Sequence, residues 1–405
     1  MSLDVLFLGK LFPREKEQEI KSKMKTGMQD AANALQWNII DGFEENDFGT
    51  MKIINYLPVD AYPNGYTDKF IEGFTFQHTE KYKADDINVK CCNIFGIKRF
   101  INNLYFRKYI KKWAKQENGK KKVILSYTAN SMFLGLVKLA KKYNKNITAG
   151  CIIADIPEFA TARDVTGLKK LYHSYQVKKC ASLYGIVDRF VLLTEQMAEK
   201  LKITSPHIVV EGIATTDEAV VNETISDTLK NDRYILYSGT LNYKFGIGTL
   251  LEAFEKTEDK NLKLVICGFG EAEEIIKEKN DPRIVFLGRV DRAEVLALQR
   301  KATVLVNPRQ NNEEFTKYSF PSKNLEYLSS GVPLVAYKLD GIPDEYDEYI
   351  CYPADNSAEA LSQEIMKICS LTEDERNALG KKAKYFVFEN KNKVKQAQRI
   401  IEFIK

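Results

Sequence analysis

Apolar runs of strand length alternate with amphipathic stretches of helix length along nearly all of the 405 residues. Continuous Val, Ile and Leu runs separated by helices indicate parallel strands buried on both faces, because the crossover helices cover the sheet. No run approaches the roughly 20 apolar residues that a bilayer crossing needs. The pattern therefore predicts a doubly wound α/β protein, and the length favours two such domains.

The alternation occurs once in each half of the chain. In the first half we expect strands at Leu3–Leu8, Trp37–Ile40, Met51–Leu57, Lys90–Ile94, Val123–Tyr127, Ile147–Ala154, Phe190–Thr194 and His207–Glu211. In the second half we expect them at Tyr234–Ser238, Leu262–Cys267, Arg283–Leu287, Thr303–Val306 and Leu334–Tyr337. The polar segment Ala214–Arg233 is the expected linker. The last segment has an apolar helical stripe that must dock on a surface.

These patterns predict domains over residues 1–220 and 221–385, followed by a helix over 386–405 that packs back on the first domain. The first domain is basic, with 33 Lys and Arg against 25 Asp and Glu in residues 1–220. The 7 cysteines form no CxxC pair, which favours a reducing, cytoplasmic setting over a disulfide or zinc framework. Leu3–Leu8 contains Asp4 and precedes no small-residue cleavage site, so we expect no secretory peptide.

Two loops that follow strands in the second half carry glycines. In the first, Gly239 and Gly246 flank Lys244, whose ammonium suits a phosphate, although a solvated lysine in a flexible loop fits equally well. The second, Gly268-Phe269-Gly270, begins like a dinucleotide fingerprint, but Glu273 occupies the third glycine position. We therefore favour a tight turn over an NAD site there.

The segment after Pro321 predicts a short helix. Ser322 can cap its first turn, and Gly331 fits a left-handed cap at its end. The free amides and the dipole at its start suit a diphosphate, and Lys323 adds charge. We expect Glu326 in the first turn, where it either accepts ribose hydroxyls or simply complements the helix dipole.

Taken in order, these loops resemble the C-terminal domains of GT-B glycosyltransferases, specifically the retaining family 4 of bacterial capsule and exopolysaccharide assembly. The matching motifs are Gly239 with Lys244-Phe245-Gly246, Gly268-Phe269-Gly270-Glu271, Phe286-Leu287-Gly288-Arg289-Val290, and Glu326 with Gly331-Val332-Pro333-Leu334. Three positions depart from the family pattern. Tyr318 replaces the first glutamate of a Glu-x7-Glu segment, Thr240 replaces an arginine, and Ala154 replaces a histidine that precedes Asp155.

The resemblance implies two Rossmann-like domains that face each other across a cleft, and a nucleotide-diphosphate sugar, UDP or GDP, held mainly on the second. It implies Lys244, Asp155 and Glu326 as catalytic residues and no metal. The donor-binding residues it implies are Gly239, Thr240, Gly268, Gly270, Arg289, Val290, Arg309, Tyr318, Ser319, Phe320, Pro321, Ser322, Lys323, Asn324 and Glu326. On the acceptor side it implies Gly9, Lys10, Asp155 and Glu158.

The implied reaction moves a sugar to a saccharide or lipid-linked saccharide in cell-surface polysaccharide synthesis. Residues 99–122 combine lysines and aromatics in a helical pattern, which fits either the inner face of the plasma membrane or ordinary packing with a solvated lysine face. No nucleic-acid motif is present. Three alternatives stay open: an inverting transferase, a nucleotide-sugar epimerase, and a catalytically silent subunit that binds nucleotide sugars.

Overall fold

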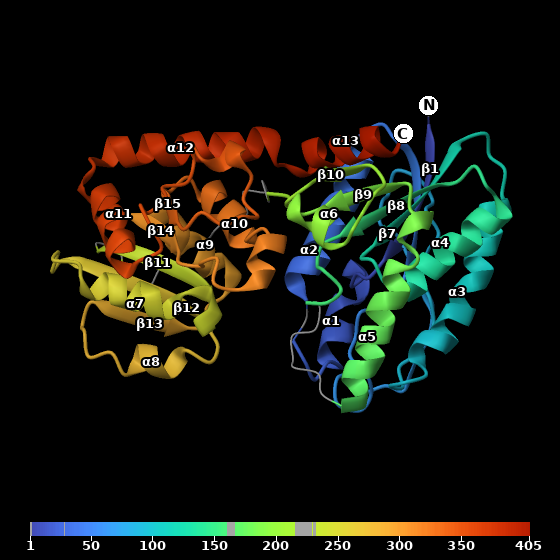
Figure 1. Ribbon diagram of the computed structural model, residues 1–405, viewed down its shortest axis with the longest axis horizontal. Helices are drawn as coiled ribbons and strands as arrows, with labels where there is room; N and C mark the ends of the chain where they lie inside the picture. Colours follow the sequence, from blue (N-terminus) through green and yellow to red (C-terminus); the bar gives the residue numbers. More distant parts are fainter. Residues whose placement is uncertain (1, 28, 160–166, 215–228, 230–231) are drawn as a thin grey trace. The chain divides into compact units, whose positions relative to one another are not determined.

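The computed structural model describes residues 2–27, 29–159, 167–214, 229 and 232–405 (Figure 1). It divides into an N-terminal unit, Met1–Ile213 with Lys393–Lys405, and a C-terminal unit, Ala214–Asn392. Most of the predicted linker 214–233 lies outside the described residues. Within the described part, no helix has the length and apolar character needed to cross a bilayer.

The N-terminal unit is built on an eight-stranded sheet in the order β10-β9-β8-β7-β1-β2-β5-β4. Its strands are β1 (Leu3–Gly9), β2 (Gly49–Asn55), β4 (Phe74–Phe76), β5 (Asp86–Asn88), β7 (Lys121–Tyr127), β8 (Thr148–Ile153), β9 (Arg189–Leu192) and β10 (His207–Val209). All pairs are parallel except β4 with β5. A small antiparallel sheet pairs β3 (Phe70–Ile71) with β6 (Cys91–Cys92).

Successive side chains of a strand point to opposite faces of the sheet. Since both faces of this sheet carry apolar side chains, helices cover both of them. Alternate residues of β1 belong to two different cores: Val5 and Phe7 to one, and Leu6 and Leu8 to the other. The helices of this unit are α1 (Glu17–Ser22), α2 (Asp30–Glu45), α3 (Lys98–Lys115), α4 (Ser131–Tyr143), α5 (Gly167–Ala181), α6 (Gln196–Lys200) and α13 (Lys393–Ile404). The first core includes α2 and α13, and the second includes α3 and α4.

One predicted strand is wrong. Residues Trp37–Ile40 lie inside α2, where Trp37, Ile40 and Phe43 are all buried. Their spacing of three residues is helical, and the same face packs against α13. The apolar stripe of α13, including Ala397 and Ile400, supplies the other side of this core.

The C-terminal unit has a wholly parallel five-stranded sheet in the order β13-β12-β11-β14-β15. The strands are β11 (Arg233–Thr240), β12 (Leu262–Phe269), β13 (Ile284–Gly288), β14 (Val304–Asn307) and β15 (Leu334–Ala336). The helices are α7 (Ile247–Glu255), α8 (Glu273–Lys277), α9 (Arg292–Lys301), α10 (Ser322–Ser330), α11 (Ala358–Ser370) and α12 (Glu373–Asn390). One core joins the sheet to α9, α10 and α12, and the other joins it to α7 and α11.

The chain leaves the C-terminal unit between α12 and α13, not at residue 385, which lies inside α12. A capping box between Thr372 and Glu375 satisfies the free amides at the start of α12, which then runs without a break to Asn390. Gly380 lets α12 lie against the end of α10, since a Cβ there would meet the carbonyl oxygen of Gly331 at 1.8 Å.

Candidate functional site

Glycines let the ends of β11 and β12 lie close together at the carboxyl edge of the C-terminal sheet. Gly239 pairs with Gly268, whose φ is +146°, and a Cβ on Gly268 would lie 1.8 Å from the carbonyl oxygen of Gly239. Gly270, with φ +155°, approaches the carbonyl oxygen of Leu241 in the same way. Thr240 ends β11 with its side chain exposed. In such sheets, ligands bind at this edge.

Helix α10 begins at Ser322 and ends at Ser330, as the sequence predicts, and Gly331 takes the left-handed conformation with φ +82°. The predicted cap is wrong: Pro321 is the N-cap, no side chain caps the helix, and Ser322 is its first residue. The amides at this end lack partners inside the helix. One of them, the N–H of Asn324, donates to the carbonyl of Pro321 at 2.8 Å.

Glu326 lies in the second turn of α10 and not in the first, because the helix starts at Ser322. Its Oε1 accepts from Lys323 Nζ at 2.7 Å and from Gln299 Nε2 at 2.6 Å, while Oε2 lies 3.6 Å from Arg292 Nη1. Burial alone would raise the pKa of Glu326, but the nearby positive charge and these hydrogen bonds outweigh it and lower the pKa. The carboxylate is therefore ionised, and Lys323 forms an ion pair with it.

Gln299 of α9 is a residue that the sequence analysis missed. Its side chain is fully buried, and Nε2 donates to Ser238 Oγ as well as to Glu326. The amide of Ser238 donates to the Tyr327 hydroxyl at 2.8 Å. Through these bonds Gln299 ties the end of β11 to α10. The available signal was a glutamine directly after the apolar pair Ala297–Leu298, at a helix position that faces the core.

Lys244 and Arg309 lie against the same two aromatic rings. Lys244 Nζ lies 5.4 Å from the ring centre of Phe245 and 5.5 Å from that of Phe315. Arg309 Cζ lies 5.5 Å and 4.9 Å from the same centres, and its Nη2 donates to Ser319 Oγ at 2.7 Å. Burial lowers the pKa of Arg309 to about 10, so its guanidinium is charged at neutral pH. The structure thus brings together Lys244, Arg309 and Ser319, which are all predicted donor or catalytic residues.

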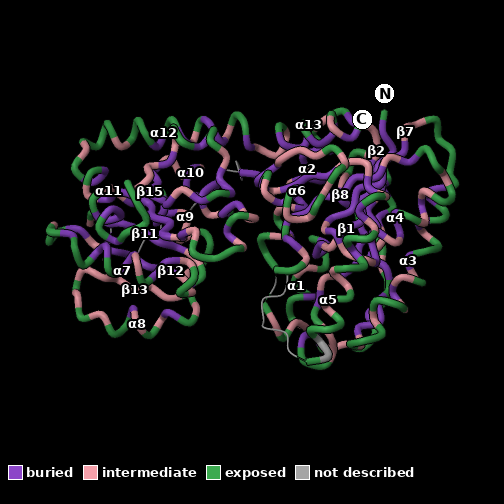
Figure 2. The backbone as a smooth tube through the Cα atoms, in the orientation of Figure 1, coloured by how far each residue is buried: buried purple, intermediate pink, exposed green. Residues whose placement is uncertain are grey.

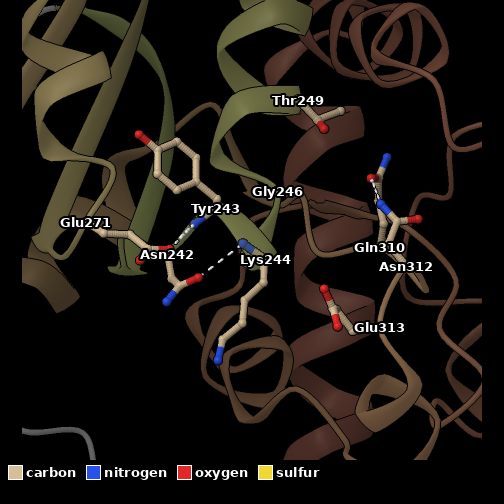
Figure 3. A pocket seen from close by; sticks show the side chains of 9 residues that line it. All are labelled: Asn242, Tyr243, Lys244, Gly246, Thr249, Glu271, Gln310, Asn312 and Glu313. Carbon is tan, nitrogen blue, oxygen red and sulfur yellow. Dashed lines mark hydrogen bonds between the residues drawn. The ribbon is translucent and has the colours of Figure 1, made fainter. Parts of the chain in front are cut away.

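A hollow of about 440 Å³ opens between the loop after β11 and the loop after β14 (Figure 3). Its lining residues are Asn242, Tyr243, Lys244, Gly246, Thr249, Glu271, Gln310, Asn312 and Glu313. The Tyr243 amide donates to Glu271 Oε1 at 3.3 Å, and the Lys244 amide donates to Asn242 Oδ1 at 3.1 Å. Lys244 lines this hollow, but Glu326 and the first turn of α10 do not.

The remaining predicted donor residues differ in exposure. Arg289 is exposed after β13, with Cζ 4.0 Å from the ring centre of Phe269, while Val290 packs against the core. Tyr318 is half-buried in a 3₁₀ turn.

Two of the predicted donor residues have clear structural roles. Phe320 is buried against Tyr346 at 5.2 Å between ring centres, so it packs in the core. Asn324 is also buried, and its Oδ1 accepts from Asn307 Nδ2 at 2.6 Å. The fold therefore already uses the Asn324 amide and side-chain oxygen.

In the N-terminal unit, the loop after β1 is fixed by buried amides. The Lys10 amide donates to Gln36 Oε1 and its carbonyl accepts from Gln36 Nε2, both at 2.8 Å. Burial, together with the charges of Arg99 and Lys98, lowers the pKa of Lys10 to about 8. Asp60 attracts Lys98, but no described carboxylate forms an ion pair with any of these three cations. Gly9 and Lys10 thus lie at a positively charged sheet edge.

Asp155 and Glu158 follow β8 at the same edge of that sheet. Asp155 is exposed, yet the surrounding protein keeps enough water away to raise the pKa of its carboxyl. Glu158 Oε2 lies 3.6 Å from Lys200 Nζ. The raised pKa brings the Asp155 carboxylate closer to the range in which a proton acceptor works at neutral pH. Among the described residues, no group of three or more His, Cys, Asp or Glu side chains is arranged to hold a metal ion.

Comparison with known proteins identifies the C-terminal unit. Residues 222–386 match the family model described as glycosyl transferases group 1. No curated protein matches the sequence. Among solved structures, sucrose-phosphate synthase from Thermosynechococcus elongatus is similar at 15% identity and TM-score 0.61, covering 99% of this chain and 98% of that one.

Two further structures align over nearly the whole chain. The lipopolysaccharide outer core galactosyltransferase WaaB has 14% identity and TM-score 0.58, with 99% of each chain covered. A structure described as trehalose-6-phosphate from E. coli bound with UDP-2-fluoro glucose has 10% identity and TM-score 0.64, covering 100% of this chain and 99% of that one. The chain has the GT-B fold, and its C-terminal unit carries the match to the glycosyl transferases group 1.

All of the predicted donor residues, from Gly239 to Glu326, lie within the matched segment 222–386. The predicted acceptor residues Gly9, Lys10, Asp155 and Glu158 lie outside it. The roles of individual residues on either unit therefore stay predictions from motif, geometry and charge.

Proposed function

We propose that this protein is a glycosyltransferase that moves a sugar from a nucleotide-diphosphate sugar, UDP- or GDP-linked, to a saccharide or lipid-linked saccharide acceptor in cell-surface polysaccharide synthesis. The observation that carries the proposal is the half-buried, ionised Glu326, whose Oε1 is held by Lys323 and Gln299 while Oε2 lies 3.6 Å from Arg292 Nη1. A carboxylate fixed in this way at the end of a parallel sheet suits the two hydroxyls of a ribose.

The leaving diphosphate requires positive charge. Lys244 and Arg309 supply it from fixed positions against Phe245 and Phe315. Fixed cations stabilise the charge that grows on the diphosphate as the bond from the anomeric carbon to oxygen breaks, because they need no reorganisation. We therefore propose that the reaction needs no metal, with the backbone at Arg289 and Val290 holding the base.

On the acceptor side we propose that Asp155 orients or deprotonates the attacking hydroxyl. Its raised pKa brings the carboxylate closer to the range in which a base works well at neutral pH. We propose retention of the anomeric configuration. We also propose a cytoplasmic enzyme that acts peripherally at the inner face of the plasma membrane.

Turnover with a panel of UDP-, GDP- and dTDP-sugars tests this function. Lys244→Ala and Glu326→Ala should each lower kcat/KM by about 100-fold or more, because each removes a contact that stabilises the transition state. Lys301→Ala and Glu278→Ala are matched controls at exposed positions of the same unit, and they should leave turnover unchanged. Near-normal turnover in both site variants would show that the donor site lies elsewhere.

The same panel separates the alternatives. Tyr318, where the family pattern has a glutamate, favours a silent subunit as the second candidate. Binding of a nucleotide sugar without turnover on any acceptor would assign that role. The anomeric configuration of the product, read by NMR, distinguishes a retaining from an inverting transferase, and a changed sugar without transfer would indicate an epimerase.

A further inference from the structure

Helix α5 of the N-terminal unit is mostly exposed. Among its described side chains, only Cys180 is buried, although the helix has 15 residues (Figure 2). Leu171 is 68% exposed and Tyr175 is 57% exposed. Helices of this length normally bury one apolar face, because packing rather than intrinsic propensity stabilises them. The outer face of α5 therefore presents apolar side chains to the surroundings.

Helix α3 also presents apolar side chains to the surroundings near its start. Phe106, Ile110 and Trp113 form its buried face, whereas Phe100 is 72% exposed and Leu104 is 50% exposed. The predicted stretch 99–122 is only partly helical, because α3 ends at Lys115 and β7 begins at Lys121. The second half of α3 packs into the core, and only the first half offers apolar side chains to the outside.

The exposed parts of α3 and α5 belong to one surface. The guanidinium of Arg99 in α3 lies 5.7 Å from the ring centre of Tyr172 in α5. Both helices also pack on α4, with Ser131 of α4 donating to Gln176 of α5 at 2.6 Å. We call this the α3–α5 surface. Its exposed apolar residues are Phe100, Leu104, Leu171, Tyr172 and Tyr175.

The charge of these two helices has one sign. Neither contains an Asp or a Glu. Their basic residues with described side chains are Lys98, Arg99, Arg107, Lys108, Lys111, Lys112 and Lys115 in α3, and Lys170, Lys178 and Lys179 in α5. The whole chain has 55 Asp and Glu against 60 Lys and Arg, so two helices without any acid differ sharply from the rest.

We propose that the N-terminal unit docks on an anionic lipid bilayer through the α3–α5 surface. Apolar side chains enter the boundary between headgroups and acyl chains, while surrounding cations bind lipid phosphates. The proposal deepens the proposed function by naming the partner of the acceptor-side unit, but its test needs no sugar transfer. Lys10, whose pKa responds to Arg99, lies beside this surface, so docking would bring lipid phosphates near the acceptor residues.

The charge distribution favours a bilayer over two other partners. A second copy of the chain would place the same cations opposite each other, and like charges in contact oppose association. A nucleic acid would satisfy the lysines and arginines but would leave Phe100 and Leu171 without apolar partners. An anionic bilayer satisfies both groups at once.

Co-sedimentation with phosphatidylcholine vesicles, with and without phosphatidylglycerol, tests the proposal. The full chain should bind only the anionic vesicles, and more weakly at high salt. Phe100→Ser with Leu171→Ser should weaken binding by about tenfold or more, since each residue transfers apolar area into the bilayer. The matched control is Leu379→Ser with Tyr385→Ser, two exposed apolar residues of α12, and it should bind as the unaltered chain does.

A second pair tests the charge. Arg107→Gln with Lys112→Gln should weaken binding about 20-fold at low salt, from roughly fivefold for each cation near the surface. Arg300→Gln with Lys381→Gln removes the same charge from exposed positions of the C-terminal unit and should have little effect. Circular dichroism confirms that each variant is folded.

Four outcomes would overturn the proposal. These are the absence of binding to anionic vesicles, equal binding to neutral vesicles, equal losses in the control pairs, and a dimer in sedimentation that Phe100→Ser with Leu171→Ser dissociates. Vesicle binding is measured without nucleotide sugar. Its failure therefore leaves the Lys244 and Glu326 experiment intact, and the converse also holds.

Discussion

In the C-terminal unit, the charged side chains at the helix that follows β14 are paired with one another. Glu326 is bound by Lys323 and Gln299, and Arg292 lies near its free oxygen. In the N-terminal unit, Lys10 follows β1, while Lys98 and Arg99 begin α3, and no described carboxylate forms an ion pair with these three side chains. Burial, together with the charges of Arg99 and Lys98, lowers the pKa of Lys10 to about 8.

This difference teaches that a shared topology leaves the charge at the edge of the sheet undetermined. The C-terminal edge is balanced by its own side chains, so a ligand there must compete with existing ion pairs. Near Lys10 the N-terminal unit has three cations that form no ion pair with any described carboxylate, and an anionic ligand would neutralise their charge. The two units also differ in titratable groups, since all 3 histidines lie in the N-terminal unit.

The largest expected effect tests whether the two units are stabilised separately. Gly380→Ala should lower the stability of the C-terminal unit by about 3 kcal/mol or more, because its Cβ would lie 1.8 Å from the carbonyl oxygen of Gly331. Gly42→Ala should do the same in the N-terminal unit, where the Cβ would meet the carbonyl oxygen of Lys393 at 2.2 Å. Hydrogen exchange measured by mass spectrometry reports the stability of each unit separately.

Matched controls exist in both units. Gly248 in α7 and Gly135 in α4 have no atom within 4 Å of an added Cβ. Alanine at either position should be neutral or stabilising by up to about 1 kcal/mol, because glycine is a poor helix former. If Gly380→Ala increased exchange equally in both units, their separate stabilisation would be disproved.

The second effect is a pH dependence confined to the N-terminal unit. Burial alone lowers the pKa of His78, but hydrogen bonds to Asp86 and Glu44 outweigh it and raise the pKa to about 9. A raised pKa means that protonation stabilises the fold. That contribution is complete below the ordinary pKa of about 6.5 and is lost as the pH rises through about 9.

Between pH 7 and pH 10 the N-terminal unit should therefore lose about 2 kcal/mol, followed by denaturant unfolding. His78→Gln should remove this dependence, whereas His207→Gln, at a partly exposed position, should keep it. An equal loss of stability in His78→Gln over the same pH range would assign the effect to other groups.

The smallest effect concerns Lys10. Lys10→Gln should raise KM for an anionic acceptor about tenfold, a loss near that of one charge-assisted hydrogen bond. Because Lys10 is protonated below a pKa of about 8, kcat/KM of the unaltered enzyme should fall as the pH rises through that value. The Lys10→Gln profile should lack this fall. An unchanged KM would remove Lys10 from the acceptor side.

Local sequence signals predicted most elements of the fold. The bounds of α10 follow from Pro321 and from Gly331, whose left-handed conformation ends the helix. The glycines after β11 and β12 mark where backbones come close. Trp37–Ile40 was misassigned because a short apolar run fits either a strand or a buried helix face, and only packing against α13 decides between them.

Several site features could not be predicted from sequence. Gln299 binds Glu326 from a different helix, and Arg309 shares Phe245 and Phe315 with Lys244 across two loops. Such contacts depend on how separate elements pack, which no local pattern contains. The exposure of α5 is a similar case, because its sequence resembles that of an ordinary basic amphipathic helix.

The sequence by itself determined the order of strands and helices in the C-terminal unit, the glycine turns and the position of helix α10. These depend on backbone conformation and on hydrophobic periodicity, which are properties of neighbouring residues. The tertiary structure alone decided which charges are paired, which pKa values shift and which apolar side chains stay outside. Those properties depend on distances between segments remote in the chain, since electrostatic and packing energies act through space.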